Sequence, residues 1–166
     1  MIDYSIDLMQ LQVLPLESKE TIYQRHTEIA PLRTRREKLT LDLFVGYCID
    51  KARDMYILGE PDVCSFLSGK AIEEALAGKY ETINGEGGIP DLYNLIEWGA
   101  IQNILDNTHK LLAHEVREER NDYGHAFCKI LRGKLQRDPN RKPFTPQEAF
   151  AIFEKALRVL EHIYKP

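Results

Sequence analysis

The chain has 166 residues, of which 43% are hydrophobic and 29% are charged, and its formal net charge is −4. This length and composition suit one globular domain that buries its own core, and they exclude disorder along the whole chain. The acidic balance disfavours a broad nucleic-acid-binding surface.

The three cysteines, Cys48, Cys64 and Cys128, are too few and too scattered for a disulfide framework. A reducing, cytoplasmic location is therefore expected. The first residues lack a basic stretch followed by an apolar run, so we expect no signal peptide. No segment contains the ~20 consecutive apolar residues that cross a bilayer, so we expect no membrane association.

Two parts are expected along the chain, an N-terminal extension over residues 1–32 and a helical domain over residues 33–166. Within the extension, residues 21–30 could form a short helix that ends near Pro31. Thr34 and Glu37 match a capping box, in which each side chain bonds a free backbone N–H group. This box and the apolar stripe after it predict a long helix that begins at Thr34 and ends near Gly59.

A further helix is expected from Pro61 to about Tyr80, because proline is tolerated in the first turn of a helix. The glycine-rich stretch 84–90 has neither the preceding strand nor the following Lys-Ser/Thr of a phosphate-binding loop. We therefore interpret it as a connection between helices. Two short helices are expected after it, over residues 90–99 and 100–106.

A longer helix is expected to start after a cap at Asp106 or Asn107 and to end by about Gly133. The last helix is marked by a capping box from Thr145 to Glu148, with proline at its first helical position. No segment alternates polar and apolar residues convincingly, so no sheet is expected. About five amphipathic helices with short connections predict an all-α, up-and-down helical bundle.

The segment with a chemical signature is Arg-Asn-Asp-Tyr-Gly-His, from Arg120 to His125. A neutral imidazole can take a proton from a ribose 2′-hydroxyl and return one to a leaving oxygen at neutral pH. A guanidinium can hold a phosphate through two hydrogen bonds and stabilise the charge that develops in the transition state. Together they form a minimal set of groups for metal-independent RNA cleavage that leaves a cyclic phosphate.

Arg120, its polar follower Asn121 and His125 make an R-x4-H pattern that resembles the hallmark of the HEPN superfamily of helical-bundle proteins. The upstream helix containing residues 68–76, a glycine-containing connection and a leucine-rich helix pair also resemble the usual HEPN layout. The resemblance covers about residues 34–135. It implies catalysis by Arg120 and His125, with Asn121 orienting the pair, in a composite site that forms between two copies of the chain.

A basic run from Lys129 to Lys142 follows the motif. Lys129 and Arg132 in this run are expected to help draw in the RNA backbone, and no cofactor is expected. The expected partners are a second copy of the chain and RNA, and a regulatory protein is also allowed. HEPN toxins paired with nucleotidyltransferase antitoxins carry a tyrosine two residues after the histidine, where this chain has Phe127. We therefore do not expect that form of regulation.

The spacing of the motif constrains how it could work. Residues five apart on a helix point about 140° apart, so Arg120 and His125 of one chain do not obviously converge on one phosphate. Asn121 and His125 are four residues apart and share a helix face. Two copies that meet across a two-fold axis would bring both pairs together.

The alternative is a non-catalytic HEPN-like module that binds or assembles with a nucleotide, nucleic acid or protein partner. Arg120 would then be half of a structural ion pair, with an acid from another helix, because the positions three and four residues away are not acidic. Metal ligands could come from His109, His114, His125 and Cys128, and the last two are only three residues apart. No second compact pair with zinc spacing accompanies them. We therefore expect no metal site.

Overall fold

The computed structural model describes residues 18–85, 87–131 and 144–165, and for residues 122–131 it describes the backbone alone. The described residues form helices and no strand, which confirms the predicted all-α fold. Within these ranges there are six helices: α1 (Lys19–Glu37), α2 (Leu43–Ile57), α3 (Pro61–Asn84), α4 (Leu92–Ile101), α5 (Asn107–Leu131) and α6 (Pro146–Ile163).

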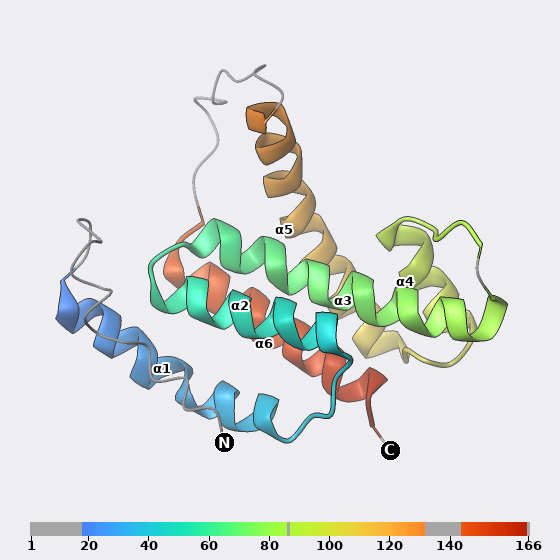
Figure 1. Ribbon diagram of the computed structural model, residues 1–166, viewed down its shortest axis with the longest axis horizontal. Helices are drawn as coiled ribbons and strands as arrows, with labels where there is room; N and C mark the ends of the chain where they lie inside the picture. The colour runs from blue at the N-terminus through green and yellow to red at the C-terminus, as the bar shows by residue number, and fades with distance from the viewer. Residues whose placement is uncertain (1–17, 86, 132–143, 166) are drawn as a thin grey trace.

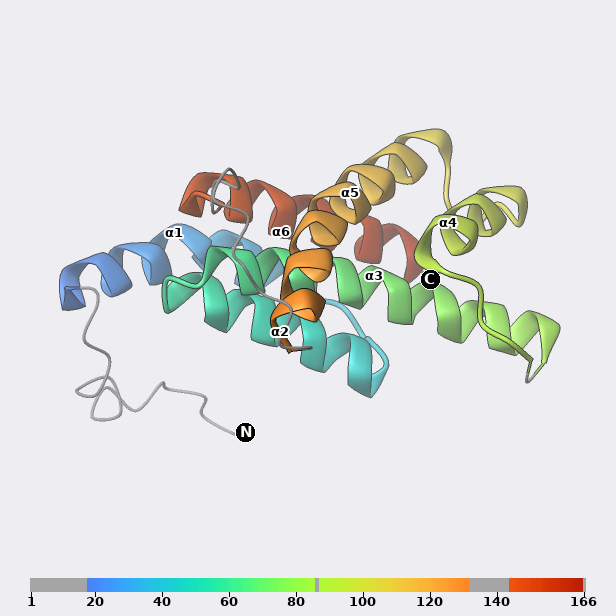
Figure 2. The same ribbon diagram turned by 90° about the horizontal axis from the view of Figure 1, so that it is seen from above.

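The helices pack around α3, which contacts α2, α4, α5 and α6. In Figure 1, α1, α2, α3 and α6 run roughly along the same direction, and α4 lies at one end of the molecule. Figures 1 and 2 show that α5 crosses this layer and leaves it with its C-terminal half. The motif segment therefore begins where α5 separates from the other helices.

A single apolar core holds the bundle together. Its largest fully buried side chains come from all six helices, with most from α6 and fewest from α1 and α5. The fully buried set is Ile29, Val45, Ile49, Ile72, Leu76, Leu95, Ile96, Val116, Phe153, Leu157, Val159 and Leu160. Burial of side chains of this size contributes about 1.5–3 kcal/mol each before the entropy cost of ordering the chain is counted.

The predicted helix start at Thr34 is wrong, because Thr34 lies inside α1 and its hydroxyl donates to the carbonyl oxygen of Ala30 at 3.3 Å. The expected boundary after residue 32 therefore also falls inside this helix. Pro31 does not end α1, because Ile29 and Leu32 on either side of it are buried in the core. These tertiary contacts outweigh the backbone hydrogen bond that a proline removes.

The short helix predicted over residues 100–106 is also wrong. α4 ends at Ile101, and Asn103 then adopts a φ of 57°, in the left-handed region that ends helices. The backbone N–H groups of Ile104 and Leu105 both donate to the carbonyl oxygen of Gly99, at 2.8 and 3.1 Å. The result is a tight turn that buries Leu105 and directs the chain into α5.

Three helix starts confirm their sequence signals, whereas α3 continues to Asn84, past its expected end at about Tyr80. α3 begins at Pro61, and α6 begins with the predicted capping box. In that box the Glu148 backbone N–H donates to Thr145 Oγ1 at 3.2 Å, and the Thr145 backbone N–H donates to Glu148 Oε2 at 2.7 Å. Asp106 caps α5, since its Oδ1 accepts from the His109 backbone N–H at 2.8 Å. None of the described helices is long and apolar enough to cross a membrane.

Candidate functional site

Arg120 lies on α5 where that helix packs against α3, and its side chain is 18% exposed. The close approach is possible because the facing residue of α3 is Gly69. A Cβ atom at Gly69 would lie only 2.8 Å from Cβ and Cδ of Arg120. The glycine therefore holds open the space that the stem of Arg120 fills.

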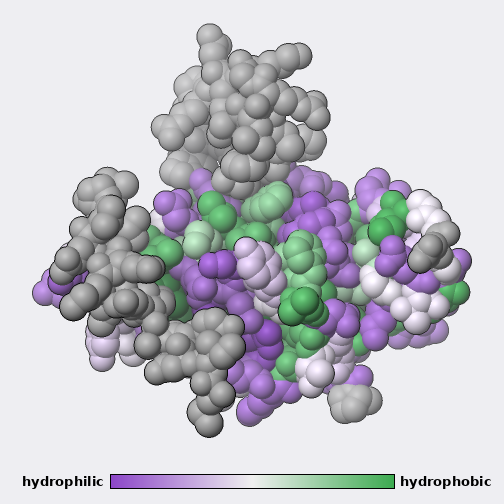
Figure 3. Space-filling model, in the orientation of Figure 1, coloured by the Kyte–Doolittle hydropathy of each residue, from purple (hydrophilic) through white to green (hydrophobic). Residues whose placement is uncertain are grey.

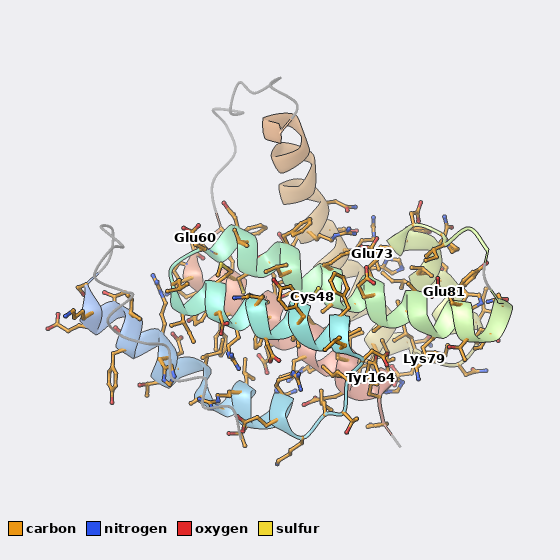
Figure 4. All side chains as sticks on the ribbon, viewed as in Figure 1. Cys48, Glu60, Glu73, Lys79, Glu81 and Tyr164 are labelled. Atoms are coloured by element: carbon orange, nitrogen blue, oxygen red, sulfur yellow. The ribbon has the colours of Figure 1, made fainter. Side chains whose placement is uncertain are left out.

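The guanidinium of Arg120 is fixed by two further side chains of α3. Its Nη2 donates to Glu73 Oε2 at 2.8 Å, and its central carbon lies 5.7 Å from the ring centroid of Phe66. Figure 4 shows Glu73 on the edge of α3 from which α5 rises. The non-catalytic alternative expected Arg120 to pair with an acid from another helix, and Glu73 of α3 is such an acid.

Glu73 belongs to a small charge network on α3. Lys70 Nζ lies 3.0 Å from Glu73 Oε2 and 2.6 Å from Glu74 Oε1. Burial lowers the pKa of Lys70, but its bonds to Glu74 and Glu73 outweigh this and raise the pKa above its ordinary value. The cations Arg120 and Lys70 are therefore balanced by two carboxylates, Glu73 and Glu74. Glu73 bonds both cations.

Glu73 is the only hydrogen-bond acceptor of Arg120 within the described part of the chain. A guanidinium carries five N–H donors, so most of its fork is not engaged by those residues. Among the described residues, one N–H group of Arg120 is therefore committed to the ion pair. The carboxylate also partly neutralises the guanidinium, which weakens its attraction for a distant phosphate.

The rest of the predicted site is described less fully. α5 is one continuous helix from Asn107 to Leu131, so Arg120 and His125 do lie on one helix, as predicted. Asn121 is half-buried. The side chains of His125 and Lys129 and the whole of Arg132 lie outside the described residues.

His114, one of the candidate ligands considered from the sequence, has another partner. Its Nε2 lies 2.9 Å from Glu97 Oε1, and Lys110 Nζ lies 2.7 Å from Glu97 Oε2. These bonds join α4 to α5. Hydrogen bonds from Lys110 and then from His114 lower the pKa of the Glu97 carboxyl. The charged form of Glu97 is therefore the one that the folded chain favours.

A second polar cluster, which the sequence did not reveal, joins the start of α5 to the end of α6. His109 and His162 stack with ring centroids 3.9 Å apart and planes 16° apart. His109 Nδ1 lies 2.7 Å from Asp106 Oδ1, and His162 Nδ1 lies 4.0 Å from Asp106 Oδ2. His162 was missed because it is far from the other two in sequence and lies on the apolar last helix.

Burial and the neighbouring ring together disfavour a charge on His162. Desolvation lowers its pKa most, and the positive charge that His109 can carry lowers it further, while Asp106 acts in the opposite direction. The pKa of Asp106 is lowered chiefly by the hydrogen bond from the His109 backbone and then by the His109 side chain. The cluster is therefore a carboxylate facing two close imidazoles.

Comparison with known proteins finds no relative of this chain. No protein-family model, curated protein or solved structure matches the chain.

Proposed function

We propose that this chain is a HEPN-type endoribonuclease that cleaves RNA without a metal ion and works as a homodimer. One observation carries the proposal: Arg120 is anchored by Gly69, Glu73 and Phe66 at the point where the continuous α5 leaves the bundle. A phosphate clamp needs a guanidinium held in one place, with donors to spare, at an accessible edge of the fold.

His125 acts as the general base and then as the general acid in this proposal. It takes the proton of the ribose 2′-hydroxyl while that oxygen attacks the adjacent phosphorus, and the bond to the 5′-oxygen breaks. A proton is returned to the leaving 5′-oxygen, and the products are a cyclic phosphate and a 5′-hydroxyl. Arg120 stabilises the added charge on the phosphate oxygens, and Asn121 orients the pair.

The substrate backbone is drawn in by Lys129 and Arg132, since cations near the motif attract phosphates. The acidic net charge of the whole chain makes such a local basic run the natural place for RNA to bind. Binding should weaken as salt concentration rises, because phosphate contacts release counterions.

The proposed second copy completes the site, because positions five apart on a helix, such as 120 and 125, lie about 140° apart around its axis. Exposed apolar residues at the start of α2 offer surface for a protein contact. Leu43 is 93% exposed and Phe44 is 52% exposed. Figure 3 shows apolar surface near the middle of the face that is seen in Figure 1, with hydrophilic residues around it. Apolar surface of this kind is common where proteins associate.

The direct test is RNA cleavage in excess chelator by the wild-type chain and by His125→Ala at matched concentration. We expect cleavage that survives chelation, leaves cyclic-phosphate ends and is lost in His125→Ala. His26→Ala is the matched control, because His26 is exposed on α1, away from the motif, and its removal should change nothing. The absence of cleavage by a folded wild-type dimer at every salt concentration would reject the nuclease.

A second candidate is a non-catalytic HEPN-like binding or assembly module, and the Arg120–Glu73 ion pair favours it. A half-buried guanidinium that already has a carboxylate needs no ligand to stabilise it. Under this reading the motif region holds α5 on α3 and presents the rest of α5 to a partner. Arg120 is then structural.

A charge swap separates the two candidates. Arg120→Glu alone should destabilise the fold, because it places two carboxylates side by side at Glu73. Adding Glu73→Arg restores opposite charges and should recover the melting temperature. Under the nuclease proposal, the refolded double variant still fails to cleave, because the guanidinium now starts from α3. Recovery of both stability and full cleavage would show that Arg120 is structural.

A further inference from the structure

We infer that Asp106, His109 and His162 form a binding site for one divalent transition-metal ion of the zinc class. Each residue offers one ligand atom, and the three atoms lie within 4.8 Å of one another. Two imidazoles and one carboxylate are ligands that zinc, cobalt and nickel accept readily. The inference does not depend on the proposed RNA chemistry.

The separations between these atoms are close to those of a bound site. Ligand atoms about 2.0–2.1 Å from a tetrahedral metal lie roughly 3.4 Å from each other. The two oxygens of the Asp106 carboxylate each face one ring at distances on either side of that value: 2.7 Å from Oδ1 to His109 Nδ1 and 4.0 Å from Oδ2 to His162 Nδ1. With one atom taken from each residue, all three atoms lie within 4.8 Å of one another. A small outward turn of the His109 ring and a small inward movement of His162 would therefore suffice. The stacked rings must open slightly, since a ligand nitrogen points at its metal in the plane of its ring.

One of the buried nitrogens without a hydrogen-bond partner among the described residues, His162 Nδ1, belongs to this cluster. A buried nitrogen of this kind costs free energy unless something binds it. Asp106 is 53% exposed, so the cluster has a side from which an ion and its water can enter. Three protein ligands would leave at least one coordination position for water or for a partner's side chain.

The ion would join the first turn of α5 to the last turn of α6. These are the ends of two helices that already pack on each other, and Asp106 is fixed in place as the cap of α5. Arg120 lies about 20 Å further along the same helix, at about 1.5 Å per residue. The metal would therefore stabilise the bundle from the far end of α5, away from the proposed catalytic groups.

The test is a titration of the chelator-treated full chain with Zn²⁺ and with Co²⁺. We expect one equivalent of Zn²⁺ to bind and to raise the melting temperature, since a ligand specific for the folded state stabilises it. Bound Co²⁺ should show ligand-field bands without thiolate-to-metal absorption, because both described cysteines, Cys48 and Cys64, are buried away from this cluster. A thiolate band would mean that a cysteine binds the ion, and the inference would fail.

Two variants locate the site. His162→Gln and Asp106→Asn should each weaken Zn²⁺ binding by at least 10–100-fold, since even loss of an outer-shell partner has an effect of about that size. Asp106→Asn is informative because asparagine is an equally good helix cap, so the start of α5 should survive. It therefore keeps the test decisive even if His162→Gln does not fold.

His114→Gln is the matched control, because His114 lies on the same helix and also bonds a carboxylate but belongs to no cluster of possible metal ligands among the described residues. Its affinity for Zn²⁺ should match that of the wild type. The inference is overturned if the wild type binds no ion saturably, if Asp106→Asn and His162→Gln bind as the wild type does, or if His114→Gln loses binding to the same degree.

Discussion

Arg120 can pack closely against α3 because the facing residue is a glycine. Gly69 is the residue of α3 that faces it, and any larger residue there would overlap the Arg120 stem. The ion pair with Glu73 and the contact with Phe66 then fix the end of the side chain. Arg120 is thus held along its whole length, as a residue with one defined geometry should be.

Gly69→Ala is expected to destabilise the fold although alanine is the better helix former. Alanine gains about 1 kcal/mol in a helix interior. The new Cβ would lie 2.8 Å from Arg120 Cβ, an atom that cannot move without its backbone, and such overpacking costs about 1–3 kcal/mol. Urea unfolding should therefore show a net loss of up to about 2 kcal/mol.

Gly78→Ala on the same helix is the control for that experiment. Apart from its chain neighbours and the backbone of its own helix, no described residue has an atom within 4 Å of a Cβ at this position, so the gain in helix propensity remains. The variant should be more stable than the wild type by about 1 kcal/mol. Equal stabilisation by both substitutions would contradict the close contact between Gly69 and Arg120.

Cys64 should be inert to alkylation in the folded protein. Burial raises the pKa of its thiol to about 12, and the side chain is fully buried. At pH 8 only about one thiol in 10⁴ would then be ionised, and the thiolate is the reactive form. Peptide-resolved mass spectrometry after iodoacetamide treatment should show modification of Cys64 only at the rate of global unfolding. Rapid labelling in native buffer would contradict the packing of α3 against α6.

At the scale of helices, α4 is joined to α5 by one acid with two basic partners. Glu97 bonds Lys110 and His114, which are four residues apart and share a face of α5. Tyr93, also on α4, lies over the Arg117 guanidinium, with 5.2 Å from its ring centroid to the central carbon. A short helix at the end of the molecule is thereby fixed to a long one.

Glu97→Gln should lower the melting temperature at neutral pH and have little effect in acid. The folded state holds the pKa of Glu97 below its ordinary value of 4.5, so it binds fewer protons there than the unfolded state does. The stabilisation is therefore complete above pH 4.5 and is lost as pH falls through the lower pKa of the folded state. The melting curves of the two proteins should converge once the pH is below the lowered pKa of the folded state. A constant difference between them at every pH would exclude the charge as its cause.

Sequence signals predicted helix boundaries well where the side chains that stop or start a helix are local. The cap at Asp106 and the box from Thr145 to Glu148 depend on residues within one turn, and both formed as predicted. The capping box predicted at Thr34 did not form, because contacts distant in sequence decide the course of α1. One such contact is Arg35 Nη2 to Glu161 Oε2, at 2.7 Å.

At the scale of the whole molecule, the contrast between local signals and long-range contacts also distinguishes the motif from the histidine cluster. Arg120 and His125 could be proposed from the sequence because they lie close together on one helix. The partner Glu73 and the pairing of His109 with His162 each depend on how two helices pack. A single sequence shows which face of a helix is apolar, but it does not show which two polar residues meet across the packed faces.

The proposed composite site makes cleavage depend on association of two chains. Positions 120 and 125 lie about 140° apart around the axis of α5. A monomer should therefore be inactive, and activity per chain should fall on dilution below the dissociation constant of the dimer. Adding excess folded His125→Ala to the wild type should also suppress its activity, since mixed dimers would lack one of the two histidines. Sedimentation of each mixture establishes whether mixed dimers form. If activity per chain is unchanged on dilution into the monomer range, a single chain holds the complete site and α5 must bend within the motif to bring its residues together.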